Sequence, residues 1–300
     1  MPALDGTLGA AYLGVLFGAI LYGITSVQTF LYFHDSRDDG RLLKLVVLFL
    51  WLLDTIHLAL ICHGLYFYMV TNFGDFAVLA SPTWTLIAQV YLTTISDLIV
   101  RGFFCRRVFI LCSRRKVLAW VLPTIIIMLS LTVAACGCGF ASRSFVLKTY
   151  KKMSEAAAML YVSLGLAVAA GGIIAASLCT LLLQSRTGFK RTDSILSFLM
   201  AFSINTGLLT SVCAIACFVT YALWPQRFIF MGIYFALSKL YVNALLASLN
   251  TRSSLRNQSY GMSTISQSVS MPIAFPTSHN TIATSSIVSE SKSYSNREGS

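Results

Sequence analysis

The 300-residue chain carries too few charged residues for a soluble protein. Hydrophobic residues make up 56% of the sequence and charged residues 11%, and the mean hydropathy is +0.75. Soluble domains are about one-quarter charged, so this composition excludes a water-exposed globule. The net charge of +11 is compatible with nucleic-acid binding, but no nucleic-acid-binding module is visible. Basic residues that flank membrane helices account for the charge, so the partner that we expect is the lipid bilayer.

Seven apolar runs follow one another along the chain, and each is long enough for the about 20 residues that a membrane helix needs. The runs are continuously apolar rather than alternating, which excludes barrel strands. They cover residues 8–33, 44–70, 84–111, 117–140, 155–184, 193–223 and 226–250. The sequence therefore predicts an all-α fold, a polytopic seven-transmembrane-helix bundle over residues 1–250. The last two spans are separated by one short turn, so we expect them to be antiparallel neighbours.

The distribution of Lys and Arg predicts the orientation, because cytoplasmic loops are enriched in both. An outside N-terminus places 14 of these residues on the inner side and 5 on the outer side, four of the five in the loop at 141–154. We interpret six residues as basic anchors at the inner interface: Arg101, Arg106, Arg107, Arg114, Arg115 and Lys116. The prediction is a multi-pass protein of the plasma membrane with a cytoplasmic C-terminus.

Residues 251–300 form a second region of different character. Twenty of these 50 residues are Ser or Thr, and no apolar periodicity is sustained. Such a segment buries too little surface to offset the entropy of ordering it. We therefore expect a disordered cytoplasmic tail.

Six polar side chains inside the apolar runs are the candidate functional residues. Ionisable groups are costly within a bilayer and mark functional sites by default. A rise of about 1.5 Å per residue places five of them in one layer near the middle of the bilayer, and Asn243 shares a helix face with Lys239 at i, i+4. This predicted intramembrane polar layer consists of Asp54, His57, Asp97, Asn205, Lys239 and Asn243.

Helical spacing favours contacts within this layer, since residues at i, i+3 and i, i+4 share a face. Along the third span, polar residues recur at every fourth position: Gln89, Thr93, Asp97 and Arg101. Lys239 requires a carboxylate partner to remain charged, and either Asp97 or Asp54 is compatible with the spacing. Arg101 is expected to pair with Asp97 or to extend to the inner surface. The layer is either a partly hydrated functional core or a set of pairs that fix helix register.

Small residues at helix-packing spacing predict two close helix contacts. One pair is Gly14 and Gly18 in the first span, and the other set lies along the fifth span: Gly165, Ala169, Gly172 and Ala176. Small side chains let helix backbones approach closely within a membrane.

Several strings in the chain resemble a large family of multi-pass membrane proteins from mushroom-forming fungi. They lie at residues 53–63, 70–74, 95–101, 185–194, 204–211 and 238–250, and the resemblance covers about residues 10–255. The family is known as a domain of unknown function, so the resemblance implies a fold and no ligand. Cys62 departs from it, because related sequences usually carry Ser at this position.

The sequence favours a receptor-like or sensor protein, on the grounds of span number, orientation, a basic third inner loop and a Ser/Thr-rich tail. The alternative is a small-solute or proton-coupled transporter that uses the polar layer. No His-rich metal pattern or nucleophile elbow is present, so we expect neither an enzyme nor a cofactor. This interpretation predicts two further partners, a small-molecule ligand and a cytoplasmic partner for the tail.

The predicted topology leaves the sequon at Asn257 without a glycan. Asn257-Gln258-Ser259 has the acceptor pattern, but a cytoplasmic tail stays away from the glycosylation machinery. Glycosidase digestion of protein from a secretory-pathway host should leave its electrophoretic mobility unchanged. A shift that disappears in Asn257→Gln would reverse the orientation.

Overall fold

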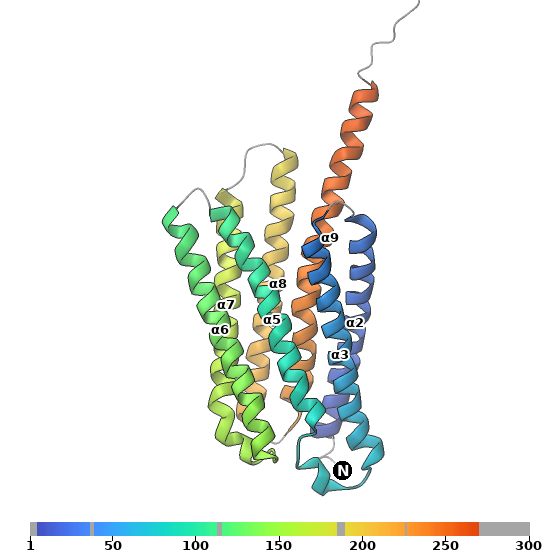
Figure 1. Ribbon diagram of the computed structural model, residues 1–300, viewed down its shortest axis with the longest axis vertical. Coiled ribbons are helices and arrows are strands. Elements are labelled where there is room, and N and C mark those ends of the chain that lie inside the picture. Colours follow the sequence, from blue (N-terminus) through green and yellow to red (C-terminus); the bar gives the residue numbers. More distant parts are fainter. Residues whose placement is uncertain (1–4, 37–38, 113–115, 185–189, 226, 270–300) are drawn as a thin grey trace, which may run out of the picture. The chain divides into compact units, whose positions relative to one another are not determined.

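The described part of the chain consists of helices joined by short turns, and it contains no strand (Figure 1). The computed structural model describes residues 5–36, 39–112, 116–184, 190–225 and 227–269, apart from the side chains of 5, 76, 116, 154, 190–206 and 252–269. The helices are η1 (Asp5–Gly9), α2 (Ala10–Asp35), α3 (Arg41–Tyr66), η2 (Phe67–Thr71), α4 (Phe76–Leu79), α5 (Trp84–Leu111), α6 (Lys116–Leu147), η4 (Lys152–Ala156), α7 (Ala157–Gln184), α8 (Lys190–Leu223) and α9 (Ile229–Val269). The predicted all-α fold is confirmed.

Six helices in the described residues are long and apolar enough to cross a membrane. These spans are Gly6–Asp35, Arg41–Thr71, Ala77–Leu111, Val117–Leu147, Ala157–Gln184 and Ile229–Thr251. The chain is therefore a multi-pass integral membrane protein whose outer faces contact lipid. Helix α8 carries a shorter described apolar segment, Gly207–Leu223, so the count of seven spans remains a prediction.

The fourth span is longer than the sequence predicts. We expected it to end at residue 140, but α6 continues to Leu147. Ala141 and Ser144 are buried on its inner face, and the Ser144 hydroxyl donates to the Phe140 carbonyl oxygen within the helix. Packing on this face extends the helix through a segment that its polar residues suggested to be a loop.

Helix α9 also continues beyond its predicted end. Its backbone is helical to Val269, although the predicted tail begins at residue 251. Adding a residue to an existing helix is far more favourable than nucleating one, so α9 can extend into a polar sequence. Internal contacts divide the chain into two units, Met1–Gln258 and Ser259–Ser300, and the first contains the bundle.

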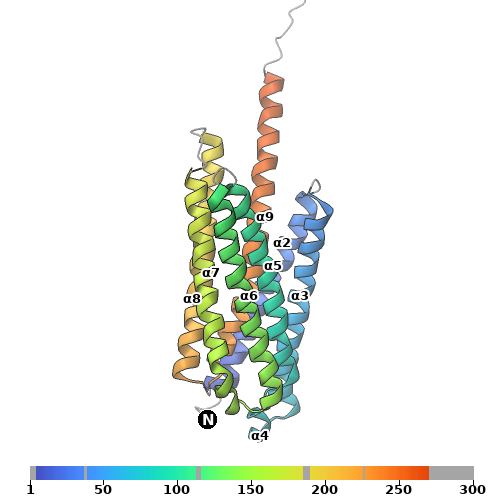
Figure 2. The ribbon, with the colours of Figure 1, turned by 60° about the vertical axis from the view of Figure 1, so that its left-hand side comes forward.

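Helix α9 is the most enclosed of the six spans. In its most apolar window 61% of the residues are buried, against 22% in the first span. Consecutive long helices from α2 to α8 pack on one another, and α5 also contacts α7. Both views place α9 among them, antiparallel to α8 as the short turn predicts (Figures 1 and 2). One end of the bundle holds the start of α2, α5, α7 and α9; we call it the N-terminal end.

Among the described glycines, those at the crossing of α2 and α9 near the N-terminal end make the closest helix contact. A Cβ atom on Gly14 would lie 2.2 Å from the Gly232 Cα, and one on Gly232 would lie 2.6 Å from the Ala10 carbonyl oxygen. Only glycine fits on both sides of this crossing. Gly18 has room, since its nearest contact is Ile61 Cδ1 at 3.7 Å.

The predicted small-residue contact on the fifth span is wrong. Gly165, Ala169, Gly172 and Ala176 are all exposed on the outside of α7. The buried face of α7 is instead formed mainly by larger side chains such as Leu164, Ile174 and Leu178. Small and large apolar side chains are equally compatible with lipid, so spacing alone did not reveal which face turns inward.

Gly14→Ala should destabilise the bundle by about 1–3 kcal/mol, because its methyl group would overlap the α9 backbone. Gly23→Ala on the same helix is the matched control, since nothing lies within 4 Å of its Cβ position. The control should be neutral or slightly stabilising, because Ala is the better helix former. Thermal unfolding in detergent measures both, and equal melting temperatures for the two variants would contradict the α2–α9 contact.

Candidate functional site

Lys239 on α9 forms a buried ion pair with Asp54 on α3. Lys239 Nζ lies 2.6 Å from Asp54 Oδ1 and also donates to the Asp54 carbonyl oxygen at 2.7 Å. The Lys239 side chain is 0% exposed and that of Asp54 is 1% exposed. The Tyr22 ring of α2 covers the ammonium group, with its centroid 5.5 Å from Nζ. Of the two carboxylates that the sequence left open, Asp54 is thus the one in contact.

His57 lies one helical turn beyond Asp54 and bonds to a different helix. Its Nε2–H donates to Gln89 Oε1 of α5 at 2.9 Å, and its ring meets the edge of Phe235 on α9. Its Nδ1 atom is buried without a hydrogen-bond partner among the described residues. His57 therefore links α3 to α5 next to the ion pair.

Asp97 and Arg101 form a second ion pair within α5. Arg101 Nε lies 2.8 Å from Asp97 Oδ2, and its terminal nitrogens approach the Ala167 carbonyl oxygen and the Tyr241 hydroxyl, both at 3.4 Å. Arg101 is only 3% exposed. The expectation that it extends to the inner surface is therefore wrong, because its nearest partners lie inside the bundle. The Asp97 Oδ1 atom has no hydrogen-bond partner among the described residues.

The remaining predicted residues occupy several places. Asn243 donates to the Leu21 carbonyl oxygen of α2 at 3.0 Å and so joins α2 to α9. Arg106 is exposed, and Arg107 donates to the Ser248 hydroxyl of α9 at 2.9 Å. The Asn205 side chain and those of Arg114, Arg115 and Lys116 lie outside the described residues.

The polar groups thus form two separate pairs rather than one cluster. Asp54 and Lys239 join α3 to α9, whereas Asp97 and Arg101 lie between α5, α7 and α9. Within each pair the opposite charges offset part of the desolvation cost of the partner. These contacts fix α3 against α9 and α5 against α7 and α9.

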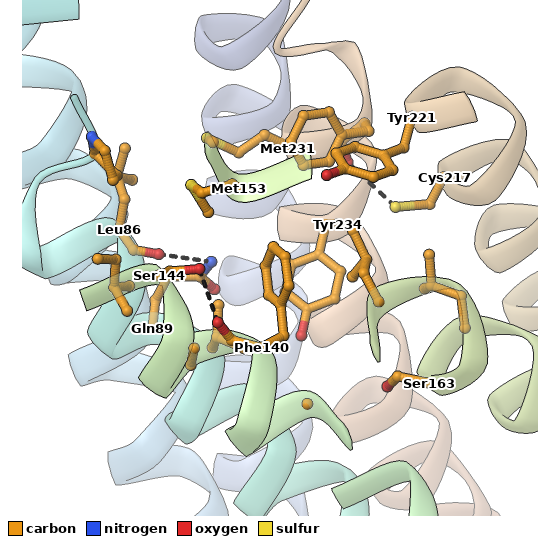
Figure 3. A pocket seen from close by; sticks show the side chains of 18 of the residues that line it. Leu86, Gln89, Phe140, Ser144, Met153, Ser163, Cys217, Tyr221, Met231 and Tyr234 are labelled. Carbon is orange, nitrogen blue, oxygen red and sulfur yellow. Dashed lines mark hydrogen bonds between the residues drawn. The ribbon is translucent and has the colours of Figure 1, made fainter. Parts of the chain in front are cut away.

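A cavity of about 100 Å³ lies at the N-terminal end of the bundle, and we call it the N-terminal cavity. Five of the long helices line it (Figure 3): Leu86 and Gln89 come from α5, Phe140 and Ser144 from α6, Ser163 from α7, Tyr221 from α8 and Tyr234 from α9. Among the described residues that line it, none is Asp, Glu, Lys, Arg or His. The sequence does not predict this cavity, since apolar and aromatic residues near span ends are common in any membrane bundle.

Tyr150 lines the N-terminal cavity from the turn between α6 and η4. Its backbone N–H donates to the Ala80 carbonyl oxygen at 3.0 Å, and its hydroxyl lies 3.4 Å from that of Tyr68. Burial raises the pKa of Tyr150 well above its ordinary value, and the neighbouring Tyr68 raises it further. The phenol therefore stays neutral at physiological pH, and so does the cavity wall that it forms.

Two smaller cavities lie further along α5, α7 and α9. One of about 40 Å³, the middle cavity, shares Ser163 and Tyr234 with the N-terminal cavity and is also lined by Asp97. Another of about 50 Å³ shares Tyr241 with the middle cavity and is lined by Arg101. The Asp97–Arg101 pair therefore borders both smaller cavities, and neither Asp54 nor Lys239 lines any of the three.

Comparison with known families matches part of the chain. The model of DUF6534, described as a family of unknown function, matches residues 167–254, a region that includes most of α7, α8 and the Lys239 region of α9. No curated protein and no solved structure matches the chain. The match supports the expected domain of unknown function and adds no ligand or reaction.

Lys239→Met should lower the free energy of unfolding by about 3–5 kcal/mol, because it leaves the Asp54 carboxylate buried without its partner. Adding Asp54→Asn to Lys239→Met should recover much of this loss. Adding Asp97→Asn to the same background is the matched control and should recover none, since Asp97 pairs with Arg101. Thermal unfolding of the four proteins in one detergent tests the pairing, and rescue by Asp97→Asn alone would assign Lys239 to the other carboxylate.

Proposed function

We propose that this protein is a seven-helix receptor or sensor that binds a small molecule in the N-terminal cavity. The observation that carries the proposal is the cavity itself, which five helices line and which no charged residue borders among those described. Ligand sites in proteins are typically concave and mainly apolar, with a few polar groups that fix orientation. With an outside N-terminus, this cavity faces the exterior.

The contacts around the cavity supply a route from ligand to helix position. Phe230, Met231 and Tyr234 line the cavity from α9, and Lys239 follows on the same helix. Gln89 lines the cavity and holds His57, which contacts Phe235 of α9. A ligand that moves Gln89 or Tyr234 therefore acts on the segment of α9 that the ion pair fixes to α3.

Further along, Ser248 of α9 contacts Arg107 of α5, so a displacement of α9 reaches the opposite end of the bundle.

A proton-coupled carrier is the second candidate, and the series of three cavities favours it. They follow α5 and α9 from the N-terminal end to Arg101, and the Asp97 carboxylate lines the middle one. Intramembrane carboxylates of this kind serve as proton relays in transporters. Neighbouring cavities share aromatic lining residues: Tyr234 lines the N-terminal and middle cavities, and Tyr241 lines the middle cavity and the one beside Arg101.

Ala141→Leu should abolish the response to ligand, since Ala141 is fully buried and lines the N-terminal cavity, so the larger side chain fills it. Ala135→Leu on the same helix is the control, because Ala135 faces the outside of the bundle. In a thermal-shift screen of small organic molecules, we expect compounds that stabilise the wild type and Ala135→Leu but not Ala141→Leu. A screen in which every stabilising compound acts equally on all three proteins would refute the ligand site.

Proteoliposomes separate the receptor from the carrier. A receptor should pass no more protons than protein-free liposomes when a potassium gradient and valinomycin impose a membrane potential, with a pH-sensitive dye inside. A carrier should instead acidify the liposome interior. This acidification should be lost in Asp97→Asn and retained in the double variant Asp54→Asn with Lys239→Met. The second variant keeps the charge of the Asp54–Lys239 site balanced, so the comparison concerns Asp97 alone.

A further inference from the structure

We propose that the ligand of the N-terminal cavity is an uncharged organic molecule of about the size of one six-membered ring, with a hydroxyl group that bonds to Gln89. This inference rests on the proposed receptor function and names the chemical class that its site accepts. Four properties of the cavity support it: volume, charge, hydrogen-bonding groups and the nature of the walls.

The volume restricts the ligand to about one small ring. The cavity measures about 100 Å³. An engineered apolar cavity of about 150 Å³ in another protein binds benzene, which shows the scale. The N-terminal cavity is smaller than that, so a single ring with one substituent fits once flexible lining side chains such as Met153 and Met231 move outward, whereas a steroid or an acyl chain is far too large.

The absence of charged groups restricts the ligand to neutral molecules. No acidic or basic residue lines the cavity in the part of the chain that the structure describes. The buried charges nearby already have partners, Lys239 with Asp54 and Arg101 with Asp97. A charged ligand would lose its hydration without gaining a counter-ion, which is costly in a site of this polarity.

Gln89 offers a hydrogen-bond donor to the cavity. Its Oε1 atom accepts from His57, and its Nε2 donates one hydrogen to the Leu86 carbonyl oxygen at 3.3 Å. An amide nitrogen carries two hydrogens, so one remains for a ligand oxygen. Figure 3 shows Gln89 at the cavity wall with this bond to Leu86.

Two serines offer acceptors. Ser144 donates to the Phe140 carbonyl oxygen at 2.8 Å and Ser163 to the Val133 carbonyl oxygen at 3.3 Å. Each hydroxyl has spent its only hydrogen and keeps its lone pairs. A ligand hydroxyl both accepts and donates, so it can take the hydrogen of Gln89 and give its own to a serine. A hydrocarbon ligand would leave the second amide hydrogen of Gln89 and the lone pairs of the two serines unused.

The walls favour a flat ring. Phe140, Tyr221, Phe230 and Tyr234 present aromatic rings, and Met153 and Met231 present thioethers. Aromatic pairs contribute beyond their buried area, and methionine sulfur packs well against ring edges. The hydroxyl groups of Tyr221 and Tyr234 lie among these apolar groups. An aromatic alcohol or a phenol is therefore the best match for the cavity.

Four probes of similar size test the class: phenol, toluene, N-methylpyridinium and benzoate. Each is titrated against wild-type protein in detergent, with thermal stabilisation as the readout and Ala141→Leu as the background for partition into the micelle. Phenol should bind about three- to tenfold more tightly than toluene, which has its shape without the hydroxyl. Neither ion should stabilise the wild type above the Ala141→Leu background. In Gln89→Met, the preference for phenol over toluene should fall to about one.

The outcomes separate this inference from the receptor proposal. Binding of either ion as tightly as phenol, or equal binding of phenol and toluene, would overturn the ligand class. A preference for phenol that persists in Gln89→Met would overturn the role of Gln89. Should Gln89→Met fail to fold, the ranking of the four probes on the wild type still decides. If compounds from the thermal-shift screen stabilise the wild type through the cavity but none of the four probes does, only the proposed ligand class is wrong. If no compound stabilises the protein through the cavity, the receptor proposal is wrong as well.

Discussion

The ion pair between Lys239 and Asp54 is the interaction on which the arrangement of the bundle depends. Apolar helices in lipid gain little from burying apolar surface against each other, so directional polar contacts carry more of the association than in water. Lys239 bonds to both the carboxylate and the backbone carbonyl oxygen of Asp54, which fixes α9 in rotation and in height against α3. Asn243 and the Gly14–Gly232 crossing then hold α2 against the same helix.

A second consequence of this arrangement is that α9 separates two different environments. One face of α9 carries the Lys239 ammonium group, which is closed off by Asp54 and Tyr22. Another face presents Tyr234 and Tyr241 to the cavities along α5 and α7. His57 and Gln89 connect the two environments through one hydrogen bond. The face of α9 with Lys239 is held in place by the ion pair. The face with Tyr234 and Tyr241 borders cavities, which leave space for side chains to rearrange.

The elements and the polar positions could be predicted from the sequence, but the directions in which side chains point could not. Continuous apolar runs identified the six spans to within a few residues at most of their ends, because hydropathy reports transfer out of water. Hydropathy does not distinguish lipid from protein interior, so the spacing of small residues from Gly165 to Ala176 predicts a helix contact on a face that is in fact exposed. Spacing likewise left Lys239 with two carboxylates, since the choice depends on the rotation of α3 and α5 about their axes. The N-terminal cavity has no local signal at all, because it is formed where five helices end together.

The neutral wall of the N-terminal cavity has a consequence for how a signal would arrive. Small uncharged molecules dissolve in hydrocarbon and equilibrate across bilayers without help, whereas ions do not. A site selective for them measures a chemical activity that is equal on both sides of the membrane, and no pump or potential difference is needed to supply it. Under the proposed function the membrane itself would be the reservoir, so the concentration available to the protein would depend on how the ligand partitions into lipid as much as on its level in water.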